Sequence, residues 1–214
     1  MTPRNTREFL SVAFYFLDHL YDFLILPTLG KLWQIEMRLR GAKTGNGKLF
    51  GRPIIKINPK SIVDIGNDFS FISNNRRCSS GSIYAPCRIH THSPSSVIII
   101  GDNVGLNGTS IVSRSARITI GKGSMVAPNV VIMDSPYHKL WPPEERGSYP
   151  GTGLDEDVTV GSDVWIGTGC LLLPGTNIGN GSVVAARSVV NGSFPENSLL
   201  AGTPARLIRK LGNQ

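Results

Sequence analysis

A histidine and an aspartate stand four residues apart in a long irregular segment of this sequence. His138 is the only histidine between residues 133 and 157, and Asp134 precedes it in the same segment. An imidazole can take a proton from an attacking group near neutral pH, and a neighbouring carboxylate can fix its tautomer and stabilise the imidazolium. We therefore predict that His138 acts as a general base and that Asp134 orients it.

The segment around this pair is too rich in large apolar side chains to be a disordered linker. It runs for 25 residues, from Met133 to Asp157, and Tyr137 and Trp141 would be costly to leave in water. Loops longer than about 12–15 residues inside a compact domain are usually functional or disordered. We predict an ordered loop, 133–157, in which Tyr137, Trp141 and Arg146 contact a substrate.

An aliphatic residue at every sixth position marks the elements that would hold this loop. The most regular run follows the loop and consists of Val160, Ile166, Leu172, Ile178, Val184 and Val190. The residues two positions earlier are small or β-branched, namely Val158, Val164, Cys170, Thr176, Ser182 and Ser188. A period of six fits neither an amphipathic helix nor the alternation of a strand. It predicts short strands joined by turns, each sending the same side chain into a common interior.

The same period is present before the loop, with less regularity. It begins after Gly41 with an irregular first coil, lapses over the polar residues 74–96, and returns between Ile100 and Ile132. The coil from residue 100 to residue 120 has a two-residue insertion near Ile118. We expect residues 42–203 to form one repeating β-domain that the loop interrupts.

Both ends of the chain have helical patterns. Apolar residues recur at helical spacing in residues 6–39, and we expect a helical segment, 1–41, that Pro27 and Gly30 divide into two helices. The second helix is expected from Lys31 to about Leu39. Basic residues near the end predict a short basic helix over 204–214, with Pro204 in its first turn.

Residues 6–39 allow two interpretations. Asp18 and Asp22 interrupt the apolar run, so a membrane-spanning helix is not expected. The helices either pack on the β-domain or on a neighbouring subunit, or they dock on a membrane surface as a peripheral contact.

Composition limits the classes of partner. The net charge of +7 favours an anionic partner, but the basic residues are scattered without an aromatic-basic platform, so nucleic acid is not expected. Cys78, Cys87 and Cys170 are predicted to be free thiols in a reducing compartment. The two nearer cysteines, with His90 and His92, match no closed zinc site, and no metal is expected.

These residues resemble the hexapeptide-repeat acyltransferases, and in particular the sugar and polysaccharide O-acetyltransferases of that family. The segment from Asp134 to His138 is similar to their Asp-x-x-x-His loop. Residues 160–209 are similar through Val-Gly-x-x-Val-Trp-Ile-Gly, Leu-Pro-Gly, Gly-x-Gly-Ser-Val-Val-Ala-Ala and Ala-Gly-x-Pro-Ala-Arg. The resemblance covers about residues 65–211, and the helical N-terminus has no counterpart in it. It implies an all-β fold, a left-handed parallel β-helix of triangular cross-section.

The resemblance also implies a coenzyme A groove between two subunits of a homotrimer. The positions that correspond to this groove are Trp165, Gly167, Ala185, Ala186, Arg187, Thr203, Pro204 and Arg206. Arg187 departs from the family pattern, in which a small residue is common. Asn107 corresponds to a corner residue that binds the acceptor, although a turn asparagine is an equal interpretation.

The function that the resemblance implies is transfer of an acetyl group from acetyl-CoA to a hydroxyl of a sugar or polysaccharide precursor. Three alternatives stay open: an N-acetyltransferase of an amino sugar, a γ-class carbonic anhydrase with zinc on His90, His92 and His138, and a non-catalytic β-helix scaffold. We expect a cytoplasmic protein, with residues 6–39 as an optional contact to the inner face of the membrane.

Overall fold

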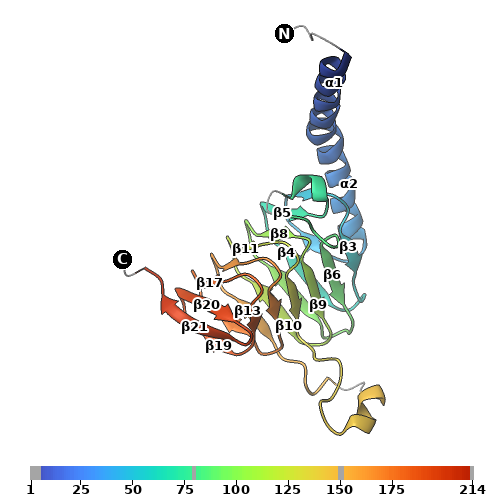
Figure 1. Ribbon diagram of the computed structural model, residues 1–214. Coiled ribbons are helices and arrows are strands. Elements are labelled where there is room, and N and C mark those ends of the chain that lie inside the picture. Colours follow the sequence, from blue (N-terminus) through green and yellow to red (C-terminus); the bar gives the residue numbers. More distant parts are fainter. Residues whose placement is uncertain (1–5, 79–80, 149–151, 213–214) are drawn as a thin grey trace.

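The fold consists of three β-sheets that the chain visits in turn, parallel except for the final strand β21 (Figure 1). The computed structural model describes residues 6–78, 81–148 and 152–212. The first sheet contains β1 (Lys43–Thr44), β4 (Ile62–Ile65), β7 (Val97–Ile100), β10 (Arg117–Ile120), β13 (Val158–Val160), β16 (Asn177–Ile178) and β19 (Ser193–Phe194). The second contains β2 (Gly47–Phe50), β5 (Phe69–Ile72), β8 (Gly105–Asn107), β11 (Met125–Val126), β14 (Trp165–Ile166), β17 (Val183–Val184), β20 (Ser198–Gly202) and β21 (Ala205–Lys210). The third contains β3 (Ile54–Lys56), β6 (Arg88–Thr91), β9 (Ser110–Ser113), β12 (Val131–Met133), β15 (Leu171–Leu172) and β18 (Val189–Val190).

Aliphatic side chains stack in register from each coil to the next. In the first sheet, Ile100 pairs with Ile120, Ile120 with Val160, and Val160 with Ile178. The six aliphatic residues of the predicted period are at most 1% exposed, and they fall in the three sheets in rotation. The small residues two positions earlier are equally buried. The predicted repeating coil is therefore confirmed, because residues of all three sheets share one core.

The irregular region before residue 97 contains more strand than the sequence indicated. β6 lies within the polar stretch 74–96, beside the short 3-10 turn η2 (Asn75–Arg77). Only Ile89 and Thr91 of β6 are buried, so the strand carries too few apolar residues to reveal the period. The predicted insertion near Ile118 corresponds to the corner Arg114–Ala116, which separates β9 from β10.

The N-terminal helices form one continuous helical run, and the predicted break at Pro27 and Gly30 is wrong. α1 (Thr6–Leu20) continues through a π-helical turn, η1 (Tyr21–Ile25), into α2 (Leu26–Leu39). Pro27 lies in the first turn of α2, where a missing N–H is tolerated. Gly30 serves close packing, because a Cβ there would lie 2.8 Å from the carbonyl oxygen of Leu49.

α2 packs against β2 and covers the first coil. Leu26 and Met37 are fully buried, and Met37 belongs to the same apolar core as the sheets. Gln34 of α2 also donates a hydrogen bond to the backbone carbonyl of Gly45. The helix is thus part of the packing of the β-domain, whereas α1 extends away from it (Figure 1).

The predicted C-terminal basic helix is wrong, because residues 205–210 form β21 instead. β21 pairs antiparallel with β20, and Gly202, with a φ of 109°, turns the chain between them. Pro204 lies in this hairpin turn and not in a helix. The exposed edge of β20 offers unpaired backbone groups, and pairing with them outweighs the helical preference of a short basic segment.

Gly121, at a corner of the coil, should be required because the next coil packs directly against it. A Cβ on Gly121 would lie 2.5 Å from backbone atoms of Gly161 and Ser162, so Gly121→Ala must displace the backbone. We expect a loss of about 1–3 kcal/mol in the free energy of unfolding, measured by urea denaturation. Gly153→Ala is the matched control, because nothing lies within 4 Å of the added Cβ. Equal midpoints for the two variants would contradict this packing.

Candidate active site

The long loop leaves the third sheet after β12 and enters the first sheet at β13. Its described residues contain the 3-10 helix η3 (Pro143–Ser148), and the loop projects from the coil on the side opposite α1 (Figure 1). Lys139 forms an ion pair with Glu145, which ties η3 to the start of the loop. The described residues of this segment thus make internal contacts of the kind that an ordered loop requires.

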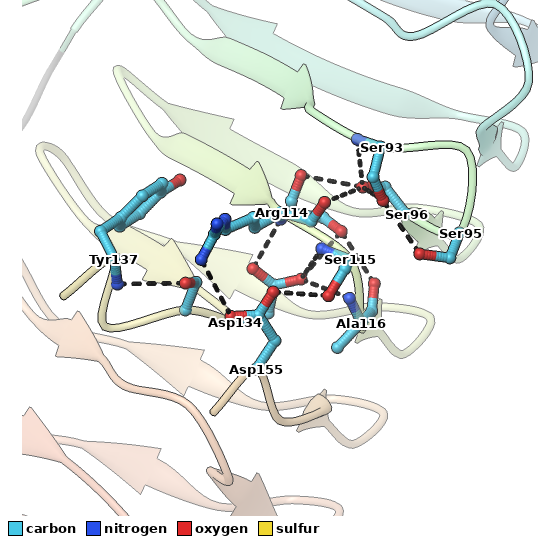
Figure 2. Close-up of polar contacts among 11 residues, drawn as sticks. Ser93, Ser95, Ser96, Arg114, Ser115, Ala116, Asp134, Tyr137 and Asp155 are labelled. Carbon is cyan, nitrogen blue, oxygen red and sulfur yellow. Dashed lines mark hydrogen bonds and ion pairs between the residues drawn. The ribbon is translucent and has the colours of Figure 1, made fainter. Parts of the chain in front are cut away.

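The Asp134 carboxylate fastens the start of the loop to the corner Arg114–Ala116 (Figure 2). It accepts hydrogen bonds from the backbone N–H groups of Arg114 at 2.7 Å, Ser115 at 3.2 Å and Ala116 at 2.8 Å. The hydroxyl of Ser113 donates a fourth bond at 2.9 Å. Asp134 is completely buried, and donors of this number compensate a carboxylate for the water that it loses.

Two further contacts fasten the end of the loop to the same corner. Asp155 accepts a hydrogen bond from the hydroxyl of Ser115 and lies 3.9 Å from the Arg114 guanidinium (Figure 2). The N–H of Glu156 donates to the carbonyl oxygen of Asp134 at 2.9 Å, which closes the base of the loop. The two ends of the loop are therefore held together on one rigid corner of the preceding coil.

Asp134 does not orient His138, and this part of the prediction is corrected. The Asp134 carboxylate is directed at the corner of the preceding coil. The His138 imidazole instead bonds through Nδ1 to the backbone carbonyl oxygen of Arg146, at 2.8 Å. A carbonyl oxygen can only accept, so Nδ1 carries the proton and Nε2 has the free lone pair. Nε2 is the atom of the ring that can act as a base.

Arg146 therefore positions His138 through its main chain. Its guanidinium donates to the carbonyl oxygen of Leu140 at 2.8 Å, which folds η3 back over the loop. The sequence suggested Arg146 only as a substrate contact. Its role as a backbone acceptor could not be predicted, because every residue type has a backbone carbonyl group. The imidazole itself is exposed.

An apolar cavity of about 380 Å³ lies beside His138, between the loop and the third sheet. Its lining residues are Met133, Pro136, His138, Leu140, Leu154, Glu156, Leu173, Pro174 and Asn191. Glu156 and Asn191 are the other polar side chains that line this cavity. Neither was predicted from the sequence as a site residue. The only feature of the sequence that could have indicated these two residues is their position next to strands of the coil.

Tyr137 lies on the other side of the loop, against the histidines of the third sheet. Its ring is 5.9 Å from that of His92, and the rings of His90 and His92 stack at 3.9 Å. Burial lowers the pKa of His90 to about 4, with a further contribution from the neighbouring His92. Burial also lowers the pKa of His92 and raises that of Tyr137. Among the described residues, no three metal-ligating side chains converge.

The remaining predicted acceptor contacts are not among the residues that line the His138 cavity. Asn107 lies at the end of β8 and donates through Nδ2 to the carbonyl oxygen of Val126 at 3.1 Å, as a corner residue would. Trp141 is 78% exposed on the loop. The structure thus joins His138 and Arg146 by a hydrogen bond, and neither Asn107 nor Trp141 lines the His138 cavity.

A second groove, of about 360 Å³, contains four of the predicted coenzyme A positions. It is lined by Ala127, Trp165, Gly167, Thr168, Val183, Val184, Ala185 and Ala186, along the second sheet. Glycine at position 167 permits the close approach of the next coil, since a Cβ there would lie 2.5 Å from the backbone nitrogen of Ala186. The groove shares no lining residue with the His138 cavity.

The other four predicted positions lie next to this groove at the C-terminal hairpin. The hydroxyl of Thr203 donates to the carbonyl oxygen of Arg187 at 3.4 Å, and the N–H of Ala185 donates to that of Leu200 at 2.8 Å. Arg187, Pro204 and Arg206 are exposed. Arg206 of the hairpin and Arg187, which follows the groove residue Ala186 and contacts the hairpin through Thr203, thus contribute two exposed arginines next to the groove.

The comparisons with known proteins agree with this architecture. Residues 157–192 match the family model "Bacterial transferase hexapeptide (six repeats)", so the predicted resemblance to the hexapeptide-repeat transferases is confirmed. AntD, an N-acyltransferase from Bacillus cereus solved with dTDP and 3-hydroxybutyryl-CoA, superposes with a TM-score of 0.61 over 84% of this chain and 88% of its own, at 19% identity. At that identity the likeness concerns the fold.

Two curated relatives are O-acetyltransferases by name. WbbJ of Escherichia coli (strain K12), named for O-acetyl transfer in lipopolysaccharide biosynthesis, is 38% identical over 55% of this chain and 63% of its own length. The galactoside O-acetyltransferase of the same organism is 34% identical over 55% of this chain and 56% of its own. The chain thus matches less than two thirds of the length of either relative.

Asp134 should contribute to stability as the anchor of the loop. Asp134→Asn places an amide against backbone N–H donors and removes charge-assisted hydrogen bonds, so we expect a loss of about 2–3 kcal/mol in the free energy of unfolding. Asp157→Asn is the control, because this exposed residue accepts from the N–H of Arg117, which an amide oxygen can also do. Urea denaturation and the rate of proteolysis within the loop measure both effects. An Asp134→Asn protein as stable as the control would contradict the anchoring.

His90 should make the stability depend on pH. Its pKa is about 4 in the folded chain and about 6.5 in the unfolded chain, so between these values the unfolded state binds a proton that the folded state does not. The free energy of unfolding should therefore fall as the pH is lowered from about 6.5 towards 4. Urea denaturation at pH 7 and pH 5 should show a larger loss for the natural protein than for His90→Gln. The same loss in both would show that His90 titrates normally.

Proposed function

We propose that this protein is an acetyl-CoA-dependent O-acetyltransferase that acts on a hydroxyl of a sugar or polysaccharide precursor. The observation that carries the proposal is the hydrogen bond from Nδ1 of His138 to the Arg146 carbonyl oxygen, which leaves Nε2 as a proton acceptor. The repeat match and the two O-acetyltransferase relatives support the reaction class. The groove along Gly167, Ala185 and Ala186 supports a thioester with a narrow arm.

The proposed reaction is a single direct transfer. Nε2 of His138 takes the proton of the acceptor hydroxyl while the oxygen of that hydroxyl attacks the thioester carbonyl carbon. The tetrahedral intermediate then collapses with cleavage of the carbon–sulfur bond, and the coenzyme A thiolate receives the proton from the imidazolium. The chemistry needs no covalent acyl-enzyme and no metal.

The proposed coenzyme A site is the groove of the second sheet in a left-handed coil. Backbone groups of Gly167 and Ala185 would bind the pantetheine arm, and Trp165 and Ala186 would flank it. Arg187 and Arg206, at the hairpin with Thr203 and Pro204, would meet the phosphates through their guanidinium groups. Cys87 and Cys170 are buried free thiols, which suits a reducing cytoplasm.

His138 should be required for turnover and not for coenzyme A binding. We expect His138→Ala to lower kcat by about 10²–10⁴-fold, the usual contribution of a positioned base. His19→Ala is the matched control, because His19 is an exposed histidine on α1. Release of coenzyme A from acetyl-CoA, with galactosides, glycans and amino sugars as acceptors, measures turnover, and thermal stabilisation by coenzyme A measures binding.

The outcomes separate the alternatives. Acetyl transfer to hydroxyl acceptors by the natural protein and by His19→Ala, with loss of turnover in His138→Ala, supports the proposal. Preference for amino sugars would move the assignment to N-acetyl transfer, and full activity of His138→Ala would remove the proposed base. A protein that coenzyme A does not stabilise and that acetylates none of these acceptors would favour a scaffold.

We further propose that the working unit is a homotrimer whose sites lie between subunits. The His138 cavity and the groove share no residue in one chain. Trp165, in the groove, is 53% exposed, and Trp141, next in sequence to the cavity residue Leu140, is 78% exposed. Such exposed aromatic side chains fit an interface better than water. One subunit would then supply the base and its neighbour the groove.

Complementation should reveal a shared site. His138→Ala lacks the base and Ala186→Trp fills the groove, so each should be inactive alone. Unfolded together and refolded, they should regain up to about a quarter of normal activity, since a quarter of random interfaces combine an intact base with an intact groove. Light scattering should give three times the 23.1 kDa chain mass. An active monomer, or no regain in confirmed mixed trimers, would contradict the shared site.

A further inference from the structure

The first helical run presents a large apolar surface that the rest of the chain does not cover. The most apolar window within Glu8–Leu39 has a mean hydropathy of 1.5, and only 6% of it is buried. Large apolar side chains of α1 and η1 are 44–75% exposed: Phe9, Leu10, Val12, Phe14, Tyr15, Phe16, Leu17, Leu20, Phe23, Leu24 and Ile25. Exposed apolar surface of this extent marks an interaction site.

These side chains occupy more than half of the circumference of α1. At 100° per residue, the arc from Val12 through Phe9 to Phe14 spans about 200°. The remaining stripe of about 160°, the polar stripe, contains Ser11 and Asp18 and also Tyr15. A neighbouring helix of a second copy would cover a stripe of about 100° and would require polar side chains on the rest.

The polar stripe is turned towards the β-domain. Asp18 forms an ion pair with Arg76, and Asp22 forms one with Arg77 at 3.4 Å, both with the η2 turn. The Arg76 guanidinium also lies 5.4 Å from the ring centroid of Tyr21. These contacts fix the rotation of the helix, so the apolar arc faces away from the coil.

Cationic side chains border the arc at its base. A groove of about 410 Å³ between the helix and β2 is lined by Lys31 and Lys48, by the ion pair of Arg77 with Asp22, and by apolar side chains that include Phe23 and Phe50. Ammonium and guanidinium groups beside aromatic rings suit the phosphate and the acyl chain of a phospholipid. Charge and apolarity thus converge on one surface.

We propose that α1 and η1 lie in the plane of an anionic phospholipid bilayer, with the apolar arc among the acyl chains and Lys31 and Lys48 at the headgroups. An amphipathic helix with this wide apolar face binds by burial and by attraction to anionic lipid. The helix does not span the bilayer, because Asp18 and Asp22 are held by arginines of a turn that belongs to the β-domain. The proposal does not depend on the proposed acetyl transfer.

Flotation of the full chain with vesicles tests this proposal. The protein should float with phosphatidylcholine vesicles that contain 30 mol% phosphatidylglycerol, less with phosphatidylcholine alone, and less in 0.5 M than in 0.1 M salt. Phe16→Glu, inside the arc, should weaken binding at least about tenfold. Ser11→Glu is the control, because it adds the same charge to the same helix within the polar stripe.

The outcomes are distinguishable from failure of folding or of catalysis. Lys31→Glu combined with Lys48→Glu should remove the preference for anionic lipid, and circular dichroism should show that all variants are folded. Equal flotation of Phe16→Glu and the natural protein would overturn the proposal. Absence of flotation of the natural protein would also overturn it. If Phe16→Glu then dissociated the oligomer in light scattering, the arc would be a contact between copies. Acetyl transfer in solution without vesicles should be the same in all these proteins.

Discussion

Stacking of one buried aliphatic side chain on the next, coil after coil, is the interaction on which this structure depends. Most strands after the loop have only two or three residues, too few to be stable by themselves. Register fixes Ile100, Ile120, Val160 and Ile178 above one another, so each strand is stabilised by its neighbours in the stack. Such a stack is one-dimensional and needs both of its ends covered. α2 packs on the first coil, and the β20–β21 hairpin completes the last.

The stack also explains how a 25-residue loop can hold a side chain in place. Its two ends bind one corner of the preceding coil through Asp134 and Asp155, and both carboxylates are at most 1% exposed. A buried carboxylate with several donors is expensive to displace. The loop then fixes His138 from within, through the carbonyl group of Arg146. Two sets of hydrogen bonds therefore position the imidazole: the first joins the loop to the coil, and the second joins His138 to the loop.

The coil was predictable from the sequence because a six-residue period reports burial directly. The loop was predictable as an interruption of that period, and His138 as its only imidazole. The role of Asp134 was not, because a spacing of four residues suggests a pair whereas its partners are backbone N–H groups of residues 114–116. The continuous helix and the final strand were missed for a similar reason. Pro27 and Gly30 are local signals that packing on β2 outweighs, and β21 exists because β20 offers it an edge.

The central claim is that the protein holds His138 with its proton on Nδ1 and Nε2 free to act as a base. The ¹⁵N chemical shifts of the two ring nitrogens, measured by long-range proton–nitrogen correlation above the pH at which the ring is protonated, report the tautomer directly. We predict a protonated Nδ1 and an unprotonated Nε2, opposite to the usual preference of a free imidazole. An Nε2-protonated ring in the folded protein would contradict this account, since the nitrogen assigned as the base would then carry the proton.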